Sequence, residues 1–109
     1  MRESSKYLAP WRATLEQAAR VHAIEIGQPL TGQLEARVTF YIERPRSVKI
    51  SDRPRPTTKP DLDKLARTLD SLTTAGLIRD DALIVELHAK KRYADTRQPG
   101  ARIRLYRAK

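Results

Sequence analysis

The chain has 109 residues, a formal net charge of +9 and no cysteine. Its length allows one small domain, and its core must be mostly aliphatic because aromatic residues make up only 6% of the chain. Disulfides and thiolate metal sites are excluded, and so is a membrane-spanning helix, since no apolar run reaches the roughly 20 residues that cross a bilayer.

The first elements expected along the chain are a helix over residues 10–25 and a strand over residues 33–43. Pro10 suits the first turn of a helix, and apolar residues recur after it at helical spacing. The face that they form contains Trp11, Leu15, Ala18 and His22. Apolar and polar residues then alternate, which predicts a strand whose buried face consists of Leu34, Ala36, Val38, Phe40 and Ile42.

A basic loop is expected over residues 44–60. It contains four prolines, no glycine and six basic residues, so it has little apolar surface to bury and is expected to become ordered on nucleic acid. Its basic residues, together with three from a later strand, are the candidate DNA-binding residues. They are Arg44, Arg46, Lys49, Arg53, Arg55, Lys59, Lys90, Lys91 and Arg92.

The remaining elements expected are a helix over residues 61–75 and strands over residues 82–93 and 101–107. Gly76 suits the end of the helix, and the short turn between the two strands predicts a hairpin. The apolar seam of this helix consists of Leu62, Leu65, Leu69 and Leu72. This order of elements predicts a single α+β domain in which a small mixed β-sheet is covered by two helices.

Positive charge is concentrated in two segments that flank an acidic one. Residues 44–60 contain six bases and one acid, and residues 87–109 contain eight bases and one acid, so their net charges are +5 and +7. Residues 61–86 contain six acids and three bases, so their net charge is −3. Because the bases come in blocks, nucleic-acid binding is favoured over a merely solubilising surface.

Four aspartates in this acidic segment are candidate metal ligands. Asp61 is expected as the N-cap of the second helix and Asp63 in its first turn, where the helix dipole favours negative charge. A purely structural role as a cap remains an alternative for them. Asp80 and Asp81 form a second acidic pair directly before an apolar strand, which shifts the balance towards a metal site. Oxygen ligands without His or Cys indicate Mg²⁺, or Mn²⁺ as a substitute.

The run KPDLDKLARTLDSL, followed by GLIRDDALIVEL and a lysine pair, resembles the RusA family of Holliday junction resolvases. The segment ESSKYLAPWR is also similar to the first helix of that family, which phages and prophages carry. The resemblance implies a Mg²⁺-dependent, homodimeric endonuclease that resolves four-way DNA junctions by paired symmetric nicks. It also implies an N-terminal edge strand, which we expect to be absent here, leaving an open sheet edge.

The resemblance also assigns roles to particular residues. The essential metal-binding aspartates of the family fall on Asp61, Asp63 and Asp81, and Asp80 is a further possible ligand. A catalytic lysine of the family falls on Arg67, where a guanidinium keeps the charge but cannot release a proton.

Three residues are assigned supporting roles: Asp70, Lys64 and Lys91. Asp70 matches an acidic position of the family, and Lys91 matches the lysine at the end of its strand. Lys64 stands where the family usually has asparagine, so a cation lies beside the expected metal site.

Two functions therefore remain open for the chain. The first is the junction-resolving endonuclease, and the second is a non-catalytic nucleic-acid-binding protein with a degenerate resolvase fold. The first predicts branched DNA as the partner, and the second predicts DNA that is bound without being cut. A cytoplasmic location is expected, in a bacterium or a phage-infected cell. Neither predicts a membrane partner or a small-molecule cofactor.

Overall fold

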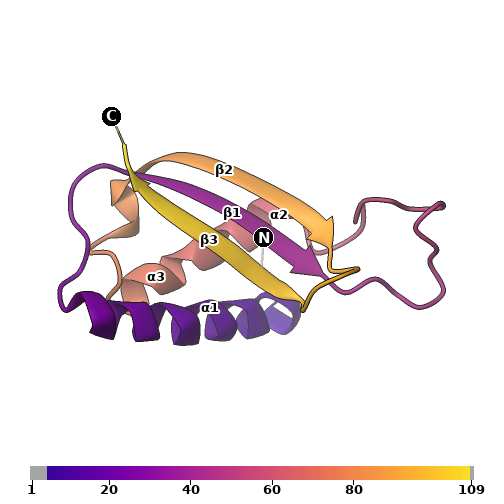
Figure 1. Ribbon diagram of the computed structural model, residues 1–109, viewed down its shortest axis with the longest axis horizontal. Coiled ribbons are helices and arrows are strands. Elements are labelled where there is room, and N and C mark those ends of the chain that lie inside the picture. Colours follow the sequence, from indigo (N-terminus) through magenta and orange to yellow (C-terminus); the bar gives the residue numbers. More distant parts are fainter. Residues whose placement is uncertain (1–4, 109) are drawn as a thin grey trace.

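A computed structural model describes residues 5–108 of the chain, with side chains described from residue 8 onwards (Figure 1). The elements are α1 (Ser5–Ile26), β1 (Leu34–Ile42), α2 (Leu62–Arg67), η1 (Thr68–Asp70), α3 (Ser71–Thr74), η2 (Asp81–Leu83), β2 (Ile84–Tyr93) and β3 (Gly100–Arg107). None of the described helices combines the length and the apolar character that crossing a bilayer requires. The elements form an α+β domain, as the sequence predicted.

The three strands form one mixed sheet in the order β2-β1-β3. Strand β1 is parallel to β2 and antiparallel to β3. The predicted hairpin between the last two strands is therefore wrong, because β1 lies between them. The connection from β2 to β3 passes the end of β1, where the amide of Ala94 donates to the carbonyl of Ile42 at 2.8 Å. The strand with the most completely buried apolar face thus gains a neighbour on both sides.

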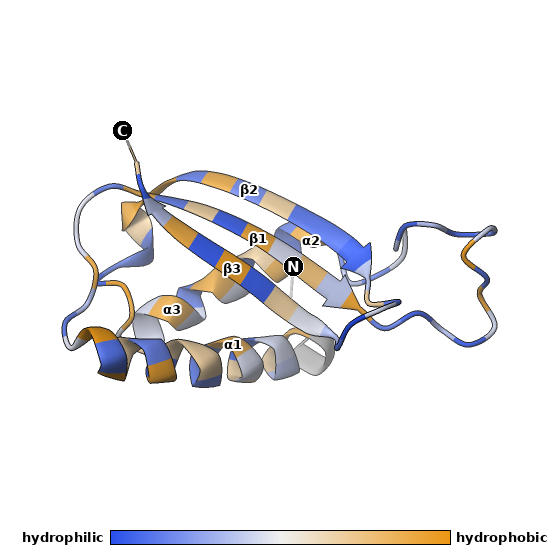
Figure 2. Ribbon diagram, viewed as in Figure 1, coloured by the Kyte–Doolittle hydropathy of each residue, from blue (hydrophilic) through white to orange (hydrophobic). Residues whose placement is uncertain are grey.

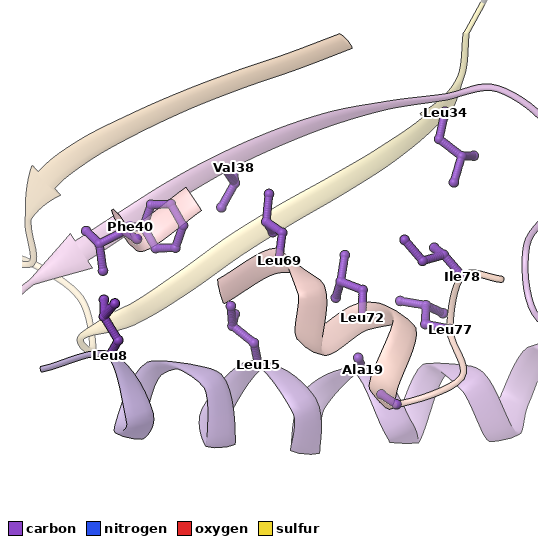
Figure 3. Close-up of a cluster of buried hydrophobic side chains, with 12 residues drawn as sticks. Leu8, Leu15, Ala19, Leu34, Val38, Phe40, Leu69, Leu72, Leu77 and Ile78 are labelled. Atoms are coloured by element: carbon purple, nitrogen blue, oxygen red, sulfur yellow. The ribbon is translucent and has the colours of Figure 1, made fainter. Parts of the chain in front are cut away.

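The helices cover one face of the sheet, and the other face is open to solvent (Figure 1). Figure 2 shows hydrophobic and hydrophilic bands alternating along β3, and it shows hydrophobic bands at the C-terminal end of α1, where Val21, Ile24 and Ile26 are exposed. The side chains between the two layers form one core, shown in Figure 3. Trp11 packs edge-to-face on Phe40, with ring centroids 5.7 Å apart, and so joins α1 to the central strand.

Helix α1 begins five residues earlier than expected, and its buried face is rotated. Leu8, Leu15 and Ala19 are buried, while Ala18 and His22, which were expected on the apolar face, are exposed. Leu15 and Ala19 are four residues apart and lie one above the other on a helix. The small side chain of Ala19 lets α1 approach α3 closely.

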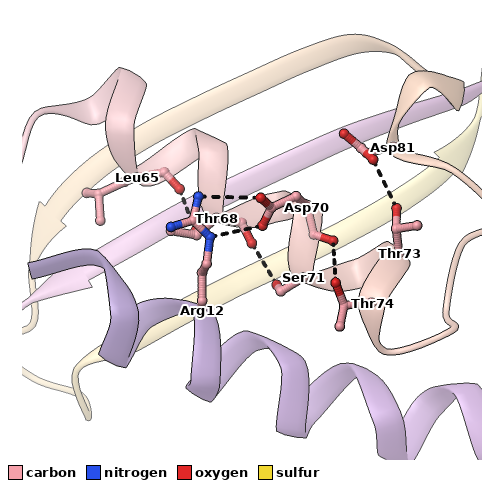
Figure 4. A network of polar contacts seen from close by, with 8 residues as sticks. All are labelled: Arg12, Leu65, Thr68, Asp70, Ser71, Thr73, Thr74 and Asp81. Atoms are coloured by element: carbon pink, nitrogen blue, oxygen red, sulfur yellow. Dashed lines mark hydrogen bonds and ion pairs between the residues drawn. The ribbon is translucent and has the colours of Figure 1, made fainter. Parts of the chain in front are cut away.

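The predicted second helix is present, but its middle is a 3₁₀ segment. The buried hydroxyl of Thr68 donates to the carbonyl of Leu65, and that of Ser71 donates to the carbonyl of Thr68 at 2.6 Å (Figure 4). Such bonds to the preceding turn compete with the α-helical ladder and tighten or bend a helix. The predicted leucine seam is confirmed, since Leu65, Leu69 and Leu72 are buried and Leu62 is partly buried. Gly76, with a φ of +80°, follows the end of α3.

The basic loop between β1 and α2 is held at its start by Arg44. Its guanidinium donates to both carboxylate oxygens of Asp95, at 2.7 and 3.0 Å, and to the carbonyls of Lys49 and Arg53. It also lies 4.0 Å from the ring centroid of Tyr93. The hydrogen bond from Arg44 holds the pKa of Asp95 below its ordinary value. Arg44 therefore shapes the loop, and its side chain is only 11% exposed.

Replacing Asp95 by asparagine removes the charge that Arg44 binds. We expect faster tryptic cleavage of the loop in Asp95→Asn, at Arg46 and Lys49, because the loop loses its tie to the β2–β3 turn. Limited proteolysis followed by mass spectrometry measures the rate. The control is Asp52→Asn, which removes an exposed acid from the same loop, and equal cleavage of both variants would contradict the prediction.

The same contact has a defined pH dependence. The pKa of Asp95 is lowered in the folded protein, so the contact stabilises the loop fully above the ordinary carboxyl value of 3.8. It is lost as the pH falls through the lowered folded value. An NMR titration of the Asp95 carboxyl should therefore show a midpoint below 3.8.

Candidate functional site

Asp61 and Asp63 lie at the start of the second helix, where the sequence placed them. Asp61 occupies the N-cap position with extended backbone angles, φ −68° and ψ 144°, but its carboxylate makes no capping hydrogen bond. The side chain is 53% exposed, and one of its oxygens lies 4.0 Å from the ammonium of Lys64. Asp63 is exposed in the first turn. The carboxylate of Asp61 therefore does not serve as a cap and stays accessible to a ligand.

Lys91 brings a cation to the backbone next to these aspartates. Its ammonium donates to the carbonyls of Thr58 and Pro60, at 2.7 and 2.9 Å, and Pro60 directly precedes Asp61. Because Lys91 lies near the end of β2, the end of this strand and the start of α2 are held together. Arg67 ends α2 and is exposed.

Asp80 and Asp81 lie at the beginning of β2. Asp80 accepts a hydrogen bond from the amide of Ala82 at 2.9 Å and so caps η2. Asp81 accepts one from the hydroxyl of Thr73, in α3, at 3.2 Å (Figure 4). This pair therefore lies beside α3, at the end of the helical run that α2, η1 and α3 form. Asp61 lies at the other end, before the first turn of α2.

The two pairs of aspartates do not meet within one chain. The helical run keeps them apart: Asp63 precedes Thr73, the partner of Asp81, by ten residues and Asp61 precedes it by twelve, which correspond to about 15 and 18 Å of helix rise. In residues 5–108, the group of three acidic or histidine side chains with ligand atoms within 4.8 Å of one another is Glu35, Glu86 and His88. Asp61 and Asp63 therefore lie at the opposite end of the helical run from Asp81 in this single chain, and a divalent cation shared by the three stays a prediction.

Asp70 connects the helices. Its carboxylate accepts hydrogen bonds from Nε and Nη2 of Arg12, at 3.1 and 3.4 Å, which joins α1 to η1 (Figure 4). This two-point contact gives Asp70 a structural partner in the helical layer.

The group formed by Glu35, Glu86 and His88 was missed in the sequence. Alternation along one strand places Glu86 beside His88, but only the register of β1 with β2 places Glu35 opposite Glu86. These side chains have partners already: His88 lies 2.7 Å from Glu86, and Glu35 accepts a hydrogen bond from Arg37, whose pKa it raises. We therefore assign this group no metal.

The candidate DNA-binding residues divide by location. The exposed ones in the loop are Arg46, Lys49, Arg55 and Lys59. Arg53 is half-buried and donates to the hydroxyl of Tyr93 at 3.5 Å, whereas Arg44 points inward. Lys90 and Arg92 lie on the open face of the sheet.

A comparison with protein families gives one match, a family described as endodeoxyribonuclease RusA, over residues 2–106. No curated protein matches the chain significantly. The matched range includes both pairs of aspartates, Arg67 and Lys91.

Alanine substitution should separate carboxylates that stabilise the fold from carboxylates that are free to bind a ligand. Asp80→Ala removes a cap and should lower the free energy of unfolding by about 1 kcal/mol. Asp61→Ala removes no capping bond and should change it by less than about 0.5 kcal/mol. Urea denaturation measures both values. An equal loss in the two variants would mean that Asp61 is a structural cap in solution.

Proposed function

Because this chain belongs to the RusA family of endodeoxyribonucleases, we propose that it resolves four-way DNA junctions by paired symmetric nicks in a Mg²⁺-dependent reaction. Asp61, Asp63 and Asp81 are the proposed metal ligands, and Arg67 is the proposed catalytic cation. The observation that carries this proposal is the pair of accessible carboxylates at the start of α2, where Asp61 occupies a cap position without capping. A purely structural aspartate at that position would form the missing bond.

A divalent ion held by these carboxylates would supply an activated water and stabilise the leaving oxygen. The cations of the chain would position the scissile phosphate beside them. Lys91, fixed by two carbonyl oxygens, and Lys64, 4.0 Å from Asp61, lie at this end of the helix. Arg67 follows Asp63 by four residues and so lies on the same helical face. Preorganised positive charge of this kind stabilises the charge that develops on a phosphate under attack.

Because the two aspartate pairs lie apart in one chain, we propose that a second copy of the chain is the partner that completes the site. Strand β2 is an edge of the sheet, and Val85 and Leu87 on it are 59% and 44% exposed. Pairing two β2 edges antiparallel about a two-fold axis places the start of one strand opposite the end of the other. Asp81 of one copy would then approach Asp61 of the other.

This arrangement would also account for the symmetry of the reaction. A two-fold dimer contains two such sites, and a four-way junction needs two matching cuts to give two duplexes. Paired edges would in addition remove an open strand edge that carries exposed apolar residues. The proposed dimer therefore accounts for three features at once: the composition of the metal site, the interface between the copies and the pairing of the nicks.

A DNA-binding protein that does not cut remains the alternative function. The separation of Asp61 and Asp81 in a single chain is the observation that favours it. Carboxylates that hold no ion would repel phosphate and weaken such a protein's binding, so their presence favours the enzyme. The experiments below distinguish the two functions.

The direct test uses a labelled four-way junction and a plain duplex, each with Mg²⁺ and with EDTA. We expect paired nicks in the junction with Mg²⁺ and no cleavage in the other reactions. Asp63→Asn should lower the nicking rate by at least about 100-fold while junction binding persists, because the variant loses a proposed ligand of the divalent ion that stabilises the transition state. Binding without cleavage in Mg²⁺ and in Mn²⁺ would support the non-catalytic alternative.

Mixing two inactive variants tests whether the site is shared between copies. Asp63→Asn and Asp81→Asn should each be inactive alone. In a mixed dimer of a shared-site enzyme, both substitutions fall in one site and the other site is intact. An equal mixture after subunit exchange should then recover about a quarter of the wild-type nicking, mostly as single nicks. No recovery, with mixed dimers verified by mass spectrometry, would place all three aspartates of a site in one chain.

A further inference from the structure

The open face of the sheet carries a row of cations that the sequence does not place together. On this face Arg37 of β1 lies directly opposite Arg104 of β3. The next outward position of β1 is Thr39, which lies between Arg102 of β3 and Lys90 of β2. These positions alternate with the buried residues Ala36, Val38 and Phe40 of β1, so they lie on the face of the sheet away from the helices, and hydrophilic bands are visible along the strands in Figure 2.

These side chains enclose a groove of about 350 Å³. It is lined by residues of all three strands, among them Thr39 of β1 and the cations Arg37, Lys90, Arg102 and Arg104. Lys90 and Arg102 are separated by two inter-strand spacings, or about 10 Å. The groove is therefore wide enough to hold a chain of phosphates between cations on both sides.

Most of this charge is not neutralised by the protein. Arg37 is bound by Glu35, but Lys90, Arg102 and Arg104 form no ion pair with an acid anywhere in the described part of the chain. Like charges on facing strands are destabilising. Repulsion among these cations therefore lowers the stability of the folded protein, and a bound polyanion would neutralise that repulsion.

The groove has a direction. Glu35 and Glu86 form the outward pair that precedes Arg37 and His88 along β1 and β2, so acids that repel phosphate lie beyond one end of the groove. At the other end β1 passes into the basic loop, and Arg97 lies 3.9 Å from the ring centroid of Tyr41. A polyanion in the groove is therefore directed towards the loop, whose far end leads into Asp61.

We propose that this groove binds the sugar–phosphate backbone of a DNA arm and directs it towards the carboxylates at the start of α2. The proposal rests on the nuclease function inferred above, since it names the path by which that substrate reaches the site. Arg102 and Arg104 alternate outward on one strand and are about 7 Å apart. Two steps along a DNA strand advance by a similar distance along the helix axis.

The test measures the salt dependence of DNA binding by the full chain in EDTA, where no cleavage occurs. A plot of log K against log salt concentration has a negative slope, and each lost phosphate contact reduces the magnitude of that slope by about 0.9. On a plain duplex, we expect Arg104→Gln to reduce the magnitude of the slope by about 0.9. The double variant Arg102→Gln/Arg104→Gln should reduce it by about 1.8. The control Arg20→Gln, an exposed arginine on α1 with the same charge change, should leave the slope unchanged.

Further variants separate charge from structure. Arg102→Lys/Arg104→Lys keeps both charges and should restore the wild-type slope, and Lys90→Gln should reduce the magnitude of the slope from the β2 side of the groove. Circular dichroism and the melting temperature report whether each variant is folded. Slopes for Arg104→Gln and Lys90→Gln equal to that of Arg20→Gln would overturn the proposal.

The outcome is independent of catalysis. Junction cleavage by the wild type, together with unchanged slopes in the groove variants, would reject the groove and leave the nuclease intact. Reduced slopes in a protein that never cuts would support the groove and reject the nuclease.

Discussion

The burial of one face of β1 is the constraint on which the rest of the structure depends. Ala36 and Phe40 of this strand are fully buried, and Leu34 and Val38 nearly so. Such an apolar face stabilises the fold most when helices cover it, because apolar surface is then removed from water. Hydrogen-bonded strands on both sides also satisfy the backbone groups of β1. The sheet order β2-β1-β3 satisfies both conditions, and it leaves β2 and β3 as the two edges.

The position of β1 also decides where the polar chemistry lies. Its alternate residues must face away from the core, so Arg37 and Thr39 reach the open face together with cations of both edge strands. Strand β2 and the second helix run in opposite directions. Lys91, near the end of β2, therefore donates to the carbonyl of Pro60, just before the start of that helix. As a result, the acids before β2 and the acids before α2 lie at opposite ends of the domain.

The exposed aspartates of this basic protein have different roles. Some are structural, because Asp70 binds Arg12, Asp95 binds Arg44 and Asp80 caps η2. Asp61 and Asp63 are exposed instead: the ammonium of Lys64 lies 4.0 Å from Asp61, and Lys91 of β2 donates to the carbonyl of Pro60, the residue before Asp61. In a family of endodeoxyribonucleases, this combination supports a site where carboxylates meet the phosphates that those cations attract.

The sequence by itself determined the element types, the apolar face of β1, the leucine seam and the spacing of two aspartate pairs, because alternation and helical spacing are local properties of the chain. It also determined the family, through the spacing of those aspartates. Only the tertiary structure decided that β1 separates the last two strands and that Arg44 points inward. It likewise decided that the aspartate pairs lie far apart and that Arg37, Lys90, Arg102 and Arg104 share one groove. These features depend on strand register and on packing between residues distant in sequence, which no local pattern encodes.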